Sequence, residues 1–378
     1  MSGRFDHCIE SGKADTTVSQ PRPSEILLRM LLRMSDVSPV GRVYRPSWID
    51  RLIRWIEQLP GPTWAFYLFV LLASILIVNA VRWFDGSLEL GALDGFQTAS
   101  TFYGVYALGL LHVLKRISGR SLESFRPALA GDDRTFTQLH FQLTTIPARG
   151  ALIATGVGLL AAAAAVLFDP EVRSGFATSP ITTIATVAVI YWAVVLVPIL
   201  FYSTVRQLGL VAHIHRDATN IDLFQPGPLY SFSALSACAG LGLAFFNYYS
   251  VATDPTTFTN PVWLAVLIIS VVLAVMFFLF PLYGMHRRII EEKDRLEAAA
   301  NKRLQATIGD LHERVDRREL SDADELNKTL TSLSLERQML EKLPTWPWKP
   351  DTFRGFFTAL LLPIILWLIT RLLERIVF

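Results

Sequence analysis

One cluster in this sequence has the residue types and spacing of metal ligands: His213, His215 and Asp217. Imidazole and carboxylate groups bind zinc and other divalent ions, but a site needs three or more such ligands with supporting hydrogen bonds. Loops elsewhere add further candidate ligands, namely His140, Asp132, Asp133 and Asp222. We favour the simpler alternative, in which both histidines lie at a membrane surface and Arg216 pairs with a neighbouring aspartate.

Groups that could act on a proton or an ion are scarce in the apolar runs of the chain. Charged residues inside a bilayer are costly and are kept mainly for ion pathways, proton relays and catalysis. The cores of the apolar runs contain no Asp, Glu, Lys or Arg. This pattern argues against a proton-coupled transporter and against carboxylate catalysis within the membrane.

The run at 98–114 is more polar than the others, since it contains Thr101, Tyr106 and His112. We expect such residues to face other helices rather than lipid. In a homo-oligomer they could line a pore shared between subunits, because channels also conduct through polar or dewetting constrictions that carry no charge.

Common catalytic and nucleotide-binding motifs are absent from the sequence, including G-x-x-x-x-G-K-[ST], G-x-G-x-x-G, H-E-x-x-H and G-x-S-x-G. The two cysteines, Cys8 and Cys238, provide neither a disulfide framework nor a zinc cluster. Basic residues follow the membrane edges and form no patch for nucleic acid. We therefore predict that the protein is not an enzyme, uses no cofactor and binds no nucleic acid.

The composition, 52% hydrophobic and 18% charged, is too apolar for a soluble domain of this length. A membrane-crossing helix needs about 20 mostly apolar residues. Six runs approach or reach this length: 64–81, 98–114, 150–168, 181–205, 231–251 and 262–283. A shorter seventh run follows at 356–370. The predicted fold is therefore an all-α transmembrane bundle of six spans, with a seventh at the C-terminal end.

Charged residues in the connecting loops indicate the orientation of this bundle, since cytosolic loops carry an excess of Lys and Arg. Basic residues precede the first span and fill the loops after the second and fourth, where Arg149, Arg206 and Arg216 are among them. Acidic residues dominate the remaining loops, where Arg82 is one of few basic residues. We therefore expect a multi-pass protein of a cell inner or plasma membrane with a cytosolic N-terminus.

Small residues spaced four apart occur in two of the predicted spans. This pattern lets helix backbones approach closely inside a membrane. The predicted packing positions are Gly150, Ala154 and Gly158 in the third span and Ser236, Gly240 and Ala244 in the fifth.

A charged segment follows the sixth span, and its apolar residues recur at helical spacing in two stripes. The first stripe runs from Ile289 to Val315 and the second from Leu326 to Leu343, with Ser321 as the helix cap between them. Neither stripe alone could be shielded from water, so we predict a cytosolic antiparallel helical hairpin, or coiled coil, over 286–343.

The predicted organisation has five parts: a disordered tail (1–24), amphipathic interfacial helices (25–60), the six-span bundle (61–285), the hairpin (286–343) and a C-terminal membrane helix (344–378). We favour a membrane anchor, scaffold or sensor that uses the hairpin to bind another copy of itself or a partner protein. The alternatives are a homo-oligomeric channel or transporter and a metal-dependent membrane enzyme.

Overall fold

The computed structural model describes residues 44–168, 179–217, 219, 221–253, 261–317 and 323–377, and nearly all of them are helical. Within these ranges the only β pairing is two isolated bridges, Pro46 with Pro147 and Leu129 with Thr219. The prediction of an all-α fold is confirmed. The predicted tail at 1–24, the amphipathic segment up to residue 43 and the cap at Ser321 lie outside the described residues.

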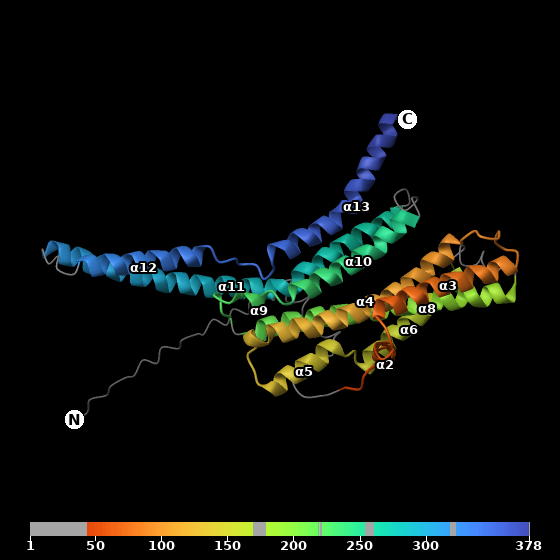
Figure 1. The fold of residues 1–378 in the computed structure, drawn as a ribbon, viewed down its shortest axis with the longest axis horizontal. Coiled ribbons are helices and arrows are strands. Elements are labelled where there is room, and N and C mark those ends of the chain that lie inside the picture. Colours follow the sequence, from red (N-terminus) through yellow and green to blue (C-terminus); the bar gives the residue numbers. More distant parts are fainter. Residues whose placement is uncertain are drawn as a thin grey trace, which may run out of the picture.

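Eleven α-helices and one 3-10 helix make up the described ranges (Figure 1). They are α2 (Trp48–Glu57), α3 (Thr63–Phe84), α4 (Gly95–Phe125), η1 (Arg126–Ala128), α5 (Asp133–Thr144), α6 (Ala148–Phe168), α8 (Pro180–Asp217), α9 (Pro226–Leu229), α10 (Ser233–Thr253), α11 (Pro261–Asp316), α12 (Ala323–Glu341) and α13 (Pro350–Val377).

Five helical stretches of the described chain are long and apolar enough to cross a membrane. They are Thr63–Phe84, Ala148–Phe168, Pro180–Asp217, Pro226–Phe246 and Leu264–Asp316. The predicted count of six spans and a seventh is not confirmed, because neither α4 nor α13 belongs to this set. The polar residues that made the run at 98–114 unusual lower the apolarity of α4.

The bundle is arranged around α8, which packs against α4, α6 and α11 (Figure 1). Helix α3 lies on α4, and α10 lies between α4 and α11. The larger of two buried apolar clusters joins α2, α4, α8 and the middle of α11. Its members include Ile53, Leu114, Leu196 and Met285. A smaller cluster around Phe278 joins α10, α11 and α13.

Helix α2 shows how an amphipathic segment is fixed to the bundle. Ser47 caps its N-terminus in a reciprocal arrangement with Asp50, so that two backbone N–H groups find acceptors. Ile49, Ile53 and Ile56 are buried on one face. Asp50 Oδ2 also accepts a hydrogen bond of 3.0 Å from the backbone N–H of Ile146, which holds α2 against the start of α6.

Helix α11 is a single helix of 56 residues that contains Pro281. At about 1.5 Å per residue it is about 80 Å long, far more than a bilayer requires. Its second half pairs with α12 in an antiparallel register: Lys293 Nζ donates to the Glu341 carbonyl at 2.9 Å, and Arg303 lies 3.6 Å from Glu336. That this hairpin lies in the cytosol stays a prediction.

Stacked aromatic rings join the base of the hairpin to α13. The His286 and Trp346 rings are 3.6 Å apart and nearly parallel, and Trp346 and Trp348 are 4.3 Å apart. The stack continues through Phe278 to Phe356, whose rings are 4.3 Å apart. The segment between α12 and α13 is therefore held against α11 rather than free in solvent.

Candidate functional site

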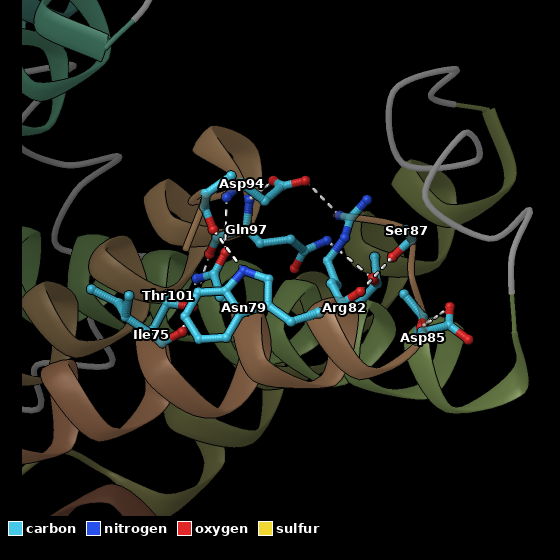
Figure 2. Close-up of polar contacts among 12 residues, drawn as sticks. Ile75, Asn79, Arg82, Asp85, Ser87, Asp94, Gln97 and Thr101 are labelled. Carbon is cyan, nitrogen blue, oxygen red and sulfur yellow. Dashed lines mark hydrogen bonds and ion pairs between the residues drawn. The ribbon is translucent and has the colours of Figure 1, made fainter. Parts of the chain in front are cut away.

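A partly buried polar network joins the end of α3, the start of α4 and the start of α8 (Figure 2). Asp94 is at its centre and forms three interactions. Its Oδ1 caps α4 by accepting from the Gln97 N–H at 2.8 Å, and its Oδ2 lies 2.5 Å from Arg82 Nη1. Its own N–H donates to Asn79 Oδ1 at 2.8 Å. One carboxylate thus satisfies a helix terminus and a cation together.

Amide and hydroxyl groups extend this network into the helix interfaces. Asn79 is fully buried, and its Nδ2 donates to the Ile75 carbonyl at 2.8 Å. Gln97 Nε2 donates to Thr186 Oγ1 at 3.1 Å, which links α4 to α8. A second link joins α8 to the loop after α3, where Thr182 donates to Asp85 Oδ2 at 2.8 Å.

Sequence reasoning missed this network. Arg82 was expected in a loop, but it lies in the last turn of α3 with only 15% of its side chain exposed. Gln97, Thr182 and Thr186 carried one detectable signal, a polar side chain within or beside an apolar run. Their partners lie up to 97 positions away in the chain, so the pairing itself could not be predicted.

A second polar cluster, at the middle of α4, joins α2, α3 and α4. His112 Nδ1 lies 3.1 Å from the Tyr67 hydroxyl, and its Nε2 lies 3.2 Å from Glu57 Oε1 without the geometry of a hydrogen bond. Tyr67, Tyr106 and His112 line a groove of about 430 Å³. A carboxylate, an imidazole and a phenol in contact can pass a proton, but the same contacts also account for the burial of His112.

Two of the three predicted pore residues, Tyr106 and His112, line the same groove, and Thr101 is not among its lining residues. Thr101 is buried and donates to the Gln97 carbonyl of its own helix at 2.8 Å. The Tyr106 hydroxyl donates to the Gly242 carbonyl of α10 at 2.9 Å, whereas His112 contacts α2 and α3. The structure therefore brings two of the three residues to one groove, and a pore between subunits stays a prediction.

The predicted metal ligands are also separated. His213 Nδ1 lies 2.8 Å from Asp217 Oδ2 on the surface of α8. His215 is fully buried, where its Nδ1 lies 3.0 Å from the Pro281 carbonyl of α11 and its ring packs between Phe125 and Phe232. Within the described ranges no group of three His, Cys, Asp or Glu residues could hold a metal ion.

Arg206 corrects another expectation, since it was placed in the loop after the fourth span. Helix α8 continues to Asp217, so Arg206 lies inside it and is only 4% exposed. Its guanidinium donates to the carbonyls of Gln142 at 2.7 Å and Thr145 at 3.1 Å, and to the Tyr44 hydroxyl at 2.5 Å. These acceptors, supplied by two other segments, allow the cation to be buried.

The small residues predicted for packing lie at close helix contacts. Ala154 and Gly158 are buried on α6, and a Cβ at Gly158 would lie 2.6 Å from the Val195 Cα of α8. Gly150 lies against the side chain of Tyr202. On α10, Ser236 and Ala244 are fully buried, and a Cβ at Gly240 would lie 2.5 Å from the Ala274 carbonyl of α11.

Comparisons with protein-family models, curated proteins and solved structures give no match to this chain.

Proposed function

We propose that this chain is a non-enzymatic, multi-pass membrane protein that acts as a scaffold, with the α11–α12 hairpin as the surface through which two copies associate. The observation that carries the proposal is the continuity of α11. Its first half is apolar enough to cross a membrane, and its second half pairs with α12. One rigid element therefore connects the bundle to the hairpin.

The base of the hairpin is anchored to the bundle at the C-terminal end of α8. Arg288 Nη1 donates to the carbonyls of His215 at 3.1 Å and Arg216 at 2.9 Å. These carbonyls are in the last turn of α8, where the helix itself supplies no N–H donor. Met285 and Ile289 are buried beside these contacts. A partner bound to the hairpin would therefore be held in a fixed relation to the membrane bundle, as a scaffold requires.

An exposed apolar face on α12 supports association of the hairpin. Leu335 and Met339 are 51% and 53% exposed, and their spacing of four places them on one side of the helix. Two helices can shield only their facing stripes, so this side needs another partner. A second copy is the simplest occupant, because closed twofold assemblies are the commonest oligomers of soluble proteins.

The cytosolic placement of the hairpin in this proposal comes from its charge. Arg287, Arg288 and Lys293 follow the apolar half of α11 directly. Basic residues close to the end of a span favour the cytosolic side. By the same rule, the N-terminal basic residues, such as Arg51 and Arg54 on α2, favour the cytosolic side.

We favour the scaffold over a metal-dependent enzyme because the predicted metal ligands His213 and His215 lie apart. We favour it over a channel or transporter because the hydroxyls of Thr101 and Tyr106 are both engaged by backbone carbonyls of the same copy.

The proposal is tested by native mass spectrometry of the full chain in mild detergent. Leu335→Glu combined with Met339→Glu places two carboxylates on the exposed apolar face, where burial of a charge is costly. We expect wild type to be dimeric and this variant to be monomeric at the same concentration.

The matched control is Ser334→Glu combined with Gln338→Glu, which uses exposed neighbouring positions at the same spacing on the same helix. It should remain dimeric. Loss of the dimer in the control as well, or a dimer in both variants, would contradict an association surface at Leu335 and Met339.

A further inference from the structure

An apolar groove runs between α6, α8 and α11 and has a volume of about 570 Å³, within the range typical of small-ligand sites. Its walls include Ile153, Val157, Phe201, Met276 and Phe280. All three helices contain stretches apolar enough to cross a membrane, so in a bilayer this groove would face hydrocarbon chains.

One end of the groove is basic. Arg149 and Arg206 are both among its lining residues, which include no Asp or Glu. Arg149 is exposed, and the backbone of Arg45 lies beside this end of the groove, because its carbonyl accepts from the Ala148 N–H at 3.1 Å. The groove thus changes along its length from apolar to cationic.

The positive charge at this end is not neutralised by protein carboxylates. In the described part of the chain none of Arg45, Arg149 and Arg206 lies within ion-pair distance of an Asp or Glu. Arg206 donates only to uncharged oxygens, and its buried Nε has no hydrogen-bond partner. The nearby carboxylate, Asp50, is already engaged by Ser47 and Ile146.

From this combination we infer that the groove binds one anionic glycerophospholipid. An acyl chain lies along the apolar walls, and the phosphate lies at Arg149, with the buried Arg206 contributing to the positive potential. Charge complementarity selects the anionic headgroup, because each basic residue near a membrane surface favours anionic lipid. The inference depends on membrane insertion, but not on association through the hairpin.

The acyl part of the site is tested by filling it. Ile153→Trp combined with Val157→Trp should lower the amount of phosphatidylglycerol retained by the full chain in mild detergent, measured by native mass spectrometry, by at least about fivefold. Leu152→Trp combined with Leu160→Trp is the control, because these residues lie on the same helix, are 62% and 74% exposed and do not line the groove.

The headgroup part is tested at Arg149, whose exposed side chain can be replaced without disturbing the core. With equal amounts of phosphatidylglycerol and phosphatidylcholine added, wild type should retain mainly phosphatidylglycerol, and Arg149→Gln should lose about fivefold of this preference. Arg120→Gln, an exposed change on α4, should keep it.

Three results would overturn the inference. They are retention by the groove-filled variant equal to that of wild type, equal loss in the Leu152 and Leu160 control, and an unchanged lipid preference in Arg149→Gln. Because Arg149→Gln does not alter the packed interior, its result stands even if the tryptophan variant fails to fold.

Discussion

Arg206 is a cation inside the protein whose charge is balanced by uncharged oxygens, and Tyr44 is one of them. The Tyr44 hydroxyl accepts from Arg206 and donates to the Thr145 carbonyl at 2.9 Å. Burial raises the pKa of Tyr44 from 10.0 to about 12, an effect that the Arg206 charge opposes only in part. The neutral phenol is therefore the form that the folded protein stabilises.

This pKa predicts a specific loss of stability in alkali. Between about pH 10 and 12 the unfolded tyrosine releases its proton while the folded one keeps it, so the unfolded state binds fewer protons and stability falls as the pH rises. The slope of this loss is at most about 1.4 kcal/mol per pH unit. Below about pH 10 both states keep the proton, so the stability does not change with pH through this group.

Tyr44→Phe separates this effect from the titration of other groups. At neutral pH the variant should be less stable by about 1–3 kcal/mol, because Arg206 loses an acceptor. Above pH 10 its melting temperature should fall less steeply than that of wild type, as measured by thermal unfolding in detergent. Parallel pH profiles for the two proteins would contradict the assignment.

At the level of single residues, the sequence predicted which side chains face protein better than it predicted the partners of those side chains. It indicated that Thr101, Tyr106 and His112 would face other helices; Tyr106 contacts α10 and His112 contacts α3, whereas the hydrogen bond of Thr101 is within α4. It could not show that Asp94 closes the turn between α3 and α4 by binding Arg82, because loop charges were used there only to assign a side of the membrane. Such pairs depend on the path of the chain.

At the scale of helices, α6 and α8 approach each other backbone to backbone at Gly158. A Cβ at Gly158 would lie 2.6 Å from Val195 Cα and 3.1 Å from the Val194 carbonyl, which are backbone atoms that cannot rotate away. Gly156, two residues earlier, has open space at its Cβ position. The two glycines therefore offer a matched comparison.

Gly158→Ala should lower the stability of the protein by about 1–3 kcal/mol, because the two helices must separate to admit the methyl group. Gly156→Ala should be neutral or stabilising by up to about 1 kcal/mol, since alanine favours a helix more than glycine does. The check is thermal unfolding of both variants in the same detergent. A Gly158→Ala protein as stable as Gly156→Ala would contradict a close backbone contact.

Hydropathy predicted where helices occur but not where they end. The run at 150–168 agrees closely with α6, which spans Ala148–Phe168. The run at 181–205 is only part of α8, because Leu208, Leu210, Val211 and Ile214 are buried against other helices beyond it. The predicted span at 262–283 and the first hairpin stripe are likewise one helix, α11.

At the scale of the whole molecule, neighbouring helices could not be predicted from the sequence outside the hairpin. The central position of α8, the groove between α6, α8 and α11, and the aromatic stack below α13 all arise from contacts between distant segments. Repeating apolar residues did predict the two hairpin helices. The pairing of Lys293 with Glu341 and Arg303 with Glu336 sets their register.

The central claim, that two copies meet through the exposed face of α12, is tested most directly by disulfide cross-linking in membranes before extraction. Leu335→Cys combined with Met339→Cys, in a chain whose Cys8 and Cys238 are replaced by alanine, should give a covalent dimer on mild oxidation, since a disulfide requires Cα atoms within about 7 Å. The pair Ser334→Cys and Gln338→Cys should give far less. Equal cross-linking of the two pairs, or none from either, would contradict the claim.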